Sequence, residues 1–247
     1  MISDVATIAE TELRLLLRNR VAAVLAIVMP VGFGAFLAFR TPDLGADTMA
    51  VLWVWIVTTQ VVTMLGFTVY LTTTITFAAR RQELYLKRLR SGQTRDLAII
   101  AGLAVPSLLV AVVQLAIILA MSRVGGMPWP QHWWPFVVGL AGGALMCSAV
   151  AVCTSAWTRG AEAAQITTAP FFFLSLMGAV TVMRKDGDAP LGQVALPGGS
   201  IAELTRAAWL PDQLDAGQLV GPLLLLVAWI AVPAAVAVRT FRWAPRE

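Results

Sequence analysis

Charged side chains are scarce in this 247-residue chain. Asp, Glu, Lys and Arg make up 13% of the residues, whereas 58% are hydrophobic and the mean hydropathy is +0.77. Soluble globular domains contain about a quarter charged residues, so this composition excludes an ordinary water-soluble fold. The uncharged runs cover most of the length and leave no room for a soluble domain. We therefore expect a single transmembrane domain over residues 1–247.

The side chains needed for metal or nucleophilic chemistry are equally rare. His132 is the only histidine, and it is predicted in a loop beside tryptophans. Cys147 and Cys153 lie six residues apart in one apolar run, too far along a helix for a disulfide, and they give no zinc spacing. An enzyme within the membrane needs a nucleophile with a nearby base, or a metal cluster. We therefore expect no catalytic residue, no metal and no cofactor in this chain.

A phosphate-binding loop is missing as well. Lys87 and Lys185 are the only lysines, and they follow Leu86 and Arg184, so the pattern GxxxxGK[ST] does not occur. The apolar runs carry no charge near their centres, which weakens a proton- or sodium-driven transporter, since these usually hold intramembrane carboxylates. The net charge of +4 is better explained by basic cytoplasmic loops than by nucleic-acid binding.

Six long apolar runs predict an all-α membrane protein with six transmembrane helices, because about 20 apolar residues in a helix span the hydrocarbon core. The predicted spans lie near residues 21–39, 51–75, 97–121, 134–157, 165–183 and 217–238. In the fourth span, Gly139 and Gly143 stand at GxxxG spacing, which favours close packing of helices.

Amphipathic segments precede the first and the last spans. Residues 2–18 place apolar side chains every three or four positions opposite polar ones, which predicts a helix lying in the membrane interface. A helical extension of the first span is the alternative. Residues 200–208 begin with a capping-box pattern, Ser200 to Glu203. They predict a short amphipathic helix that lies on the membrane surface, on the outer side of the cell membrane.

Basic residues set the expected orientation. With six spans and both termini inside, the cytoplasmic segments hold most of the 18 Lys and Arg residues. Such a bias is typical of cytoplasmic loops. We therefore expect a multi-pass protein of the cell membrane with cytoplasmic N and C termini. The most charged stretch, Arg80 to Asp96 (RRQELYLKRLRSGQTRD), then also lies in the cytoplasm, between the second and third spans.

Four sequence features together resemble the permease subunits of ABC-2 type exporters, such as the drug and antibiotic efflux systems of actinobacteria. They are ELRLLLRNR ahead of the first span, RRQE followed by LKRLR between the second and third spans, Leu196-Pro197-Gly198 ahead of the last span, and AVRTFRW at the end. The resemblance covers essentially the whole chain.

The resemblance implies a transport subunit that works with a separate ATP-hydrolysing subunit, which binds the ATP. Two permeases, identical or related, pair within the membrane lipid, and the loop between spans two and three forms a coupling helix that docks on the ATPase. Carried over to this sequence, the coupling residues are Glu83, Leu86, Lys87, Arg88, Leu89 and Arg90. The family often has glycine at the position of Leu84 and proline at that of Gln93. Without this glycine, we expect a helix that continues across Leu84.

Mildly polar residues within the spans admit two interpretations. Thr59, Gln60, Thr63 and Gln114 either bond neighbouring helices or line a path for a hydrophobic or amphipathic substrate leaving the cell. Spacing alone favours the first. For the whole chain, the rival to an exporter permease is a non-transporting membrane scaffold or assembly factor. A membrane enzyme ranks third, because the necessary side chains are absent.

Overall fold

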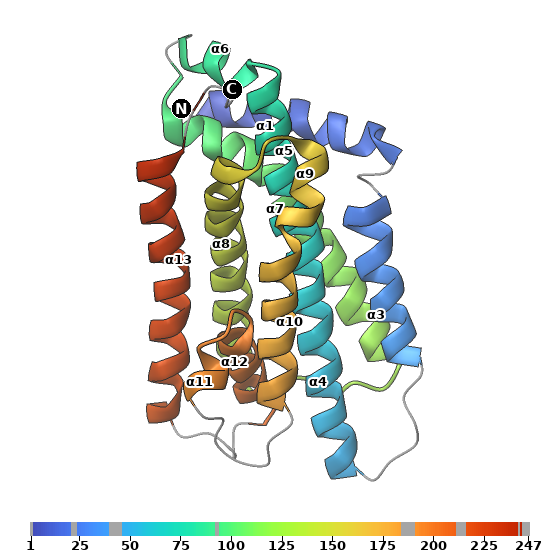
Figure 1. Ribbon diagram of the computed structural model, residues 1–247. Coiled ribbons are helices and arrows are strands. Elements are labelled where there is room, and N and C mark those ends of the chain that lie inside the picture. The colour runs from blue at the N-terminus through green and yellow to red at the C-terminus, as the bar shows by residue number, and fades with distance from the viewer. Residues whose placement is uncertain are drawn as a thin grey trace.

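The computed structural model describes residues 2–20, 24–39, 46–91, 94–183, 191–210, 216–241 and 243. Within these ranges the chain forms helices joined by turns and short extended segments, and it contains no strand. Long helices run side by side between two ends of the molecule, whereas α1 (Ile2–Arg18) lies across one end (Figure 1). The predicted all-α fold is confirmed.

In the described part of the chain, six apolar helical segments, which we call crossings, connect the two ends. In chain order they are η1 (Val24–Val28) with α3 (Met29–Phe39); α4 (Ala46–Met64) with η2 (Leu65–Leu71) and α5 (Thr72–Gln82); α7 (Asp96–Val124); α8 (Trp133–Trp157); α9 (Ala161–Thr167) with α10 (Ala169–Met183); and α13 (Val220–Thr240). Both η1 and η2 are π-helical.

Five of the crossings are long and apolar enough to traverse a membrane. In the first crossing the described apolar helix is shorter, Ala26–Phe39, and residues 21–23 of the predicted span lie outside the described part of the chain. The fifth crossing begins at Ala161 and turns at Thr168. Pro170 follows this turn and lacks the N–H that would continue the hydrogen-bond ladder.

The second crossing is the longest and the most enclosed. It runs from Met49 to Gln82, 34 residues, with 72% of its apolar stretch buried inside the chain, against 22% for the last crossing. At 1.5 Å per residue its length is about 50 Å, well beyond a hydrocarbon core of about 30 Å. The α5 end therefore projects past the membrane and carries Arg80 and Arg81 with it.

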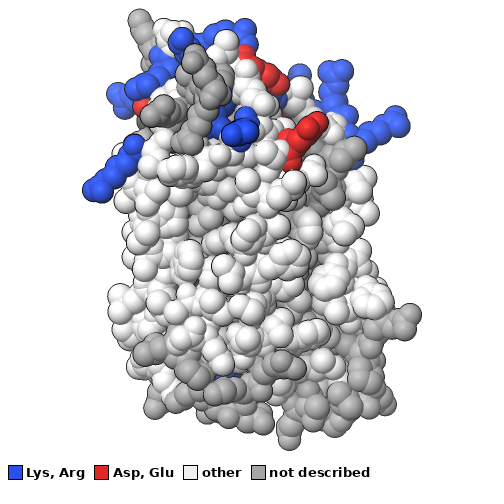
Figure 2. Space-filling view, viewed as in Figure 1, with Lys and Arg blue, Asp and Glu red and all other residues white. Residues whose placement is uncertain are grey.

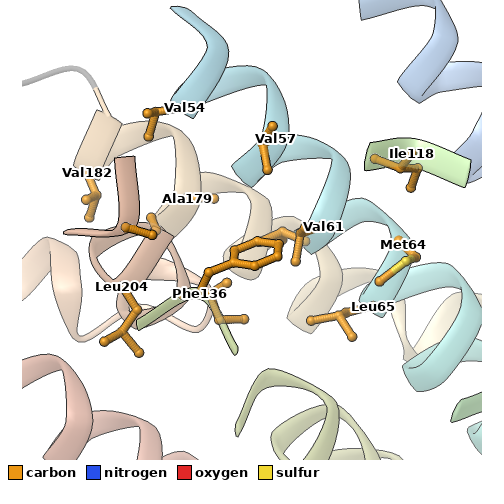
Figure 3. Close-up of a cluster of buried hydrophobic side chains, with 14 of the residues drawn as sticks. Val54, Val57, Val61, Met64, Leu65, Ile118, Phe136, Ala179, Val182 and Leu204 are labelled. Atoms are coloured by element: carbon orange, nitrogen blue, oxygen red, sulfur yellow. The ribbon is translucent and has the colours of Figure 1, made fainter. Parts of the chain in front are cut away.

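An apolar core fills the space around the second crossing. Val57 and Val61 of α4, Phe136 of α8, Ala179 of α10 and Leu204 of α12 (Gly199–Trp209) belong to one buried cluster (Figure 3). All five are at most 3% exposed. The second crossing is therefore the element around which the others pack.

The predicted amphipathic helix ahead of the last span is α12, at the end opposite α1 (Figure 1). We expected it on the membrane surface, but it packs among α4, α8, α10 and α13, and all of its residues are buried. The predicted capping box is also wrong. Gly198, with φ 87°, precedes the helix, and the Ser200 hydroxyl donates to the Val194 carbonyl at 3.5 Å instead.

Space for α12 comes from the glycines of α8. A Cβ added at Gly139 would lie 3.1 Å from Leu204 Cβ, and one added at Gly143 would lie 2.7 Å from Ile201 Cδ1. The GxxxG pair therefore serves packing within this chain, and it lets a helix enter the bundle that hydropathy alone would leave on the surface.

Helix α1 is held to the bundle through α7. Ile8 is 6% exposed and lies over Gly102, where an added Cβ would be 2.7 Å from Ile8 Cβ. Asp4 and Thr7, nearer the start of the helix, are exposed. The sequence prediction of a separate amphipathic helix is confirmed, because α1 crosses the end of the bundle instead of extending the first crossing (Figure 1).

Substituting Gly102→Ala tests this contact. Alanine is the better helix former by about 1 kcal/mol, but its Cβ would collide with the branched carbon of Ile8, and overpacking costs about 1–3 kcal/mol. We expect a lower unfolding temperature in detergent. The control is Gly32→Ala, where an added Cβ meets nothing within 4 Å. Equal behaviour of the two variants would contradict the close approach of α1 to α7.

Candidate functional site

Most charged side chains visible in Figure 2 gather at one end of the molecule, whereas its sides are uncharged. This end holds α1, the end of α5, α6 (Tyr85–Ser91) and the end of α13 (Figure 1). We call it the basic end. All six residues predicted for coupling lie there.

The chain turns sharply between α5 and α6. The helix stops at Gln82, and Leu84 has φ 57°, the only positive φ of a non-glycine residue in the described chain. A left-handed backbone costs an L-residue about 1–2 kcal/mol, whereas glycine adopts it freely. The expectation of a helix continuing across Leu84 is therefore wrong. Glycine would adopt this backbone conformation without strain. Leu84 is held in it by the packing of α6, which begins at the next residue.

Leu86 anchors α6 to the bundle. Its side chain is 0% exposed and belongs to a second apolar cluster with Ile8 of α1, Phe77 of α5 and Ile99 of α7. Leu89 packs against the same cluster. Of the predicted coupling residues, these two leucines thus face the bundle and fix the position of α6.

Lys87 and Arg88 lie on the outer face of α6. Both are exposed, and with Glu83, Leu84 and Ser91 they line a shallow hollow of about 380 Å³. Arg88 Nη2 donates to the backbone oxygen of Glu83 at 2.9 Å, while Lys87 has no bonded partner within the described ranges. Positive charge beside a hollow favours a partner with a complementary acidic surface.

Arg80 joins α5 to α1 through a bidentate ion pair. Its Nε lies 2.7 Å from Glu12 Oε1 and its Nη2 lies 2.9 Å from Glu12 Oε2, while Nη1 lies 2.6 Å from Glu83 Oε2. Glu12 is only 5% exposed. Because parallel N–H···O bonds satisfy both carboxylate oxygens, the pair holds α1, α5 and the turn before α6 in one arrangement.

The ring of Tyr85 lies 5.7 Å from the Arg80 guanidinium. Partial burial raises the pKa of the Tyr85 phenol, and the Glu12 carboxylate raises it further. The phenol therefore stays protonated and adds no negative charge beside the ion pair.

Arg81 points to the other side of α5 and is 1% exposed. Its guanidinium donates to the backbone oxygens of Thr158 and, at 3.4 Å, of Ala156. These carbonyls close the C-terminal end of α8, where backbone oxygens lack partners within the helix and a cation is favourable. The buried charge thus caps α8 and ties it to α5.

Trp243, which follows α13, contacts α6 through Arg90. The Trp243 ring lies 5.2 Å from the Arg90 guanidinium and 5.2 Å from the ring of Phe241, which meets Phe77 at 5.9 Å. Arg90 Nε is also 3.3 Å from Asp96 Oδ1. Arg90, predicted as a partner contact, is therefore already engaged within the chain.

The four residues predicted for a substrate path, Thr59, Gln60, Thr63 and Gln114, are at most 6% exposed. Gln60 Nε2 donates to the Gly34 carbonyl at 2.8 Å, and its Oε1 accepts from the Ser122 hydroxyl at 3.2 Å. The side chain thereby links the first three crossings. Within a single chain these contacts favour the helix-bonding interpretation, and the path stays a prediction.

Gln114 connects the two π-helical segments. Its Nε2 donates to the Ala26 carbonyl in η1 at 2.7 Å, and its Oε1 accepts from the Thr68 hydroxyl of η2 at 2.6 Å. Thr68 Oγ1 also lies 2.7 Å from the Ala26 oxygen. π-Helical turns are rare interruptions of a regular helix, and here side chains of two other crossings bond to the Ala26 carbonyl of η1.

Sequence reasoning missed the role of Glu12 and the separate roles of Arg80 and Arg81. Glu12 carries a usable signal, because it stands four residues after Ile8 and four before Leu16, on the apolar face of α1. An acidic residue on that face needs a basic partner. Nothing local in the sequence identifies which arginine supplies it.

These features define a multi-pass, all-α membrane protein that presents an anchored basic helix at one end. Residues 3–186 match the family model of the ABC-2 type transporter. The chain therefore belongs to the ABC-2 type transporter family, in which it is a transmembrane permease subunit, and members of the family generally work with a separate ABC ATPase. The match includes α1 to α10 and ends before α12 and α13. No curated protein and no solved structure matches the sequence.

Replacing Glu12→Gln tests the ion pair. Loss of the carboxylate leaves a largely buried guanidinium with fewer acceptors, so we expect a loss of about 1–3 kcal/mol of unfolding free energy. The matched control is Glu10→Gln, which breaks the exposed Glu10–Arg14 pair on the same helix and should cost less than about 1 kcal/mol. Unfolding in detergent measures both. Similar losses of unfolding free energy in the two variants would show that the Glu12–Arg80 pair stabilises the protein no more than the exposed Glu10–Arg14 pair.

The substitution Trp243→Ala tests the contact of Trp243 with Arg90 of α6. Loss of the ring removes a cation–π contact worth about 0.5–1 kcal/mol, so amide hydrogen exchange in residues 86–91 should accelerate about two- to five-fold. Trp243→Phe should restore part of the protection, and Trp134→Ala, an exposed tryptophan of α8, should leave exchange there unchanged. An unchanged rate of amide hydrogen exchange in Trp243→Ala would show that Trp243 does not stabilise α6.

Proposed function

We propose that this chain is the permease subunit of an exporter in the cell membrane, with cytoplasmic termini and a separate ATPase docked on α6. One observation carries the proposal. Helix α6 shows Lys87 and Arg88 to solvent on one face while Leu86 holds its other face in the bundle. If the positive charge of this helix served only to orient the chain in the membrane, the helix would not need the buried contact of Leu86.

The contacts around α6 provide a route for force. A partner that displaces α6 also displaces Leu86 and the turn at Glu83, which is bonded to Arg80. Arg80 is paired with Glu12 of α1, and α1 packs on α7 at Gly102. Arg81 is bonded to the end of α8. A small displacement of α6 thereby reaches the second, third and fourth crossings together.

The energy comes from the partner in this proposal. The sequence has no phosphate-binding loop, so ATP is bound and hydrolysed by the ATPase subunit, and this chain converts the resulting movement. A second permease, identical or related, completes the transporter within the membrane lipid.

The proposed substrate is hydrophobic or amphipathic, such as a drug or antibiotic. The crossings offer hydroxyl and amide groups instead of charges, which suits a weakly polar molecule. A path past Thr59, Gln60, Thr63 and Gln114 requires the first three crossings to separate and their hydrogen bonds to exchange. Movement of α1 and α5 by the ATPase is the event that would separate them.

Reversing the free charge of α6 tests the coupling. We expect Lys87→Glu to weaken co-purification of the cognate ATPase at least several-fold, and Lys87→Glu with Arg88→Glu to abolish ATP-dependent export. Membrane insertion should be unaffected, because both side chains are exposed. Leu89 is left intact, since it packs on the core. Arg159→Glu, an exposed arginine between α8 and α9, controls for a charge change at the same end.

Two readouts separate the candidate functions. ATPase co-purification tests the partner, and the sensitivity of a deletion strain to hydrophobic antibiotics, restored by the wild-type chain alone, tests export. Unchanged export in the double variant would contradict a coupling role for this face of α6. If no ATPase binds and deletion has no substrate-dependent effect, the chain is a membrane scaffold or assembly factor.

A further inference from the structure

A groove lies between α1 and the second crossing at the basic end. Its volume is about 510 Å³, within the range of about 300–1,000 Å³ typical of ligand pockets. Leu15 and Leu16 of α1 form one wall, and Leu71, Ile75 and Ala79 form the other. Leu15 is 41% exposed, so an apolar wall of the groove is open to its surroundings.

The groove stands at the level of a membrane boundary. Leu71 follows Met49, the start of the apolar stretch, by 22 residues, which is about 33 Å along a helix and close to the thickness of the hydrocarbon core. Ile75 and Ala79 lie one and two turns further. Apolar walls at this height border the lipid headgroups and the first carbons of the acyl chains.

The polar lining carries no net charge, because it contains two glutamates and two arginines, but within the described part of the chain only one of the arginines takes part in an ion pair. The three guanidinium nitrogens of Arg80 are taken by Glu12 and Glu83, and the hydroxyls of Thr72 and Thr76 donate to backbone oxygens. Arg18, at the end of α1 beside Asn19, is exposed and has no ion pair within the described ranges. An anionic group entering the groove therefore finds its counter-charge at Arg18, at the groove's polar margin.

We propose that this groove binds one phospholipid with an anionic headgroup from the adjoining leaflet. The phosphate meets Arg18, and an acyl chain lies between Leu15 and Leu16 on one side and Leu71 and Ile75 on the other. Apolar walls at membrane depth together with a single free cation at headgroup height match this occupant. The bound lipid fills the space beside the Glu12–Arg80 pair and braces α1 against α5.

Native mass spectrometry of the full chain tests the proposal. The protein is reconstituted in phosphatidylcholine containing phosphatidylglycerol, extracted in mild detergent, and examined for retained lipid. We expect phosphatidylglycerol to be retained over phosphatidylcholine by about five-fold, as for one basic residue near the headgroups. Arg18→Gln should abolish the preference, and Ile75→Trp, which fills the groove, should reduce retention of both lipids. Arg159→Gln and Ile166→Trp, at exposed positions outside the groove, should retain the wild-type pattern.

Each other outcome overturns the proposal. Equal retention of the two lipids, an unchanged preference in Arg18→Gln, or a similar loss in the control variants would exclude a lipid held by Arg18. Competition by inorganic phosphate alone would show an anion site without an acyl chain. A change of oligomeric state in Ile75→Trp with lipid retention intact would show that a second copy fills the groove. The assay needs neither ATPase nor substrate, so its failure leaves the proposed transport function untouched.

Discussion

Two adjacent arginines at the end of α5 hold the basic end of this protein together. Neighbouring side chains on a helix are turned by about 100°, so Arg80 reaches Glu12 on α1 while Arg81 reaches the carbonyls that end α8. Both partners are buried or nearly so. Breaking such a contact leaves a desolvated charge, and this cost makes the arrangement of α1, α5, α6 and α8 a single unit.

The membrane interior imposes a second constraint, because polar groups there must find partners within the protein. Gln60, Thr68 and Gln114 meet this requirement by bonding to backbone oxygens of the first crossing. The bonds of Thr68 and Gln114 form at the π-helical segments. Gln60 and Gln114, two of the four residues predicted for a substrate path, therefore join helices.

Prediction from the sequence succeeded where a local pattern was sufficient. The all-α class, the amphipathic character of α1 and the packing role of Gly139 and Gly143 follow from the spacing of apolar and small residues. It failed at Leu84, since leucine rarely adopts a positive φ, and the turn is held by tertiary contacts: the burial of Leu86 and the bond of Arg80 to Glu83. The six residues predicted for coupling lie together at the basic end, but their division into anchors and exposed charges depends on how α6 packs.

By itself, the sequence determined that the chain is an all-α membrane protein, because long uncharged runs leave no other stable form in a bilayer. It also determined which segment is the most charged. Only the tertiary structure decided that α12 enters the bundle and that Glu12 pairs with Arg80, 68 residues away. Hydropathy measures the affinity of a segment for apolar surroundings, and it does not say whether lipid or other helices provide them.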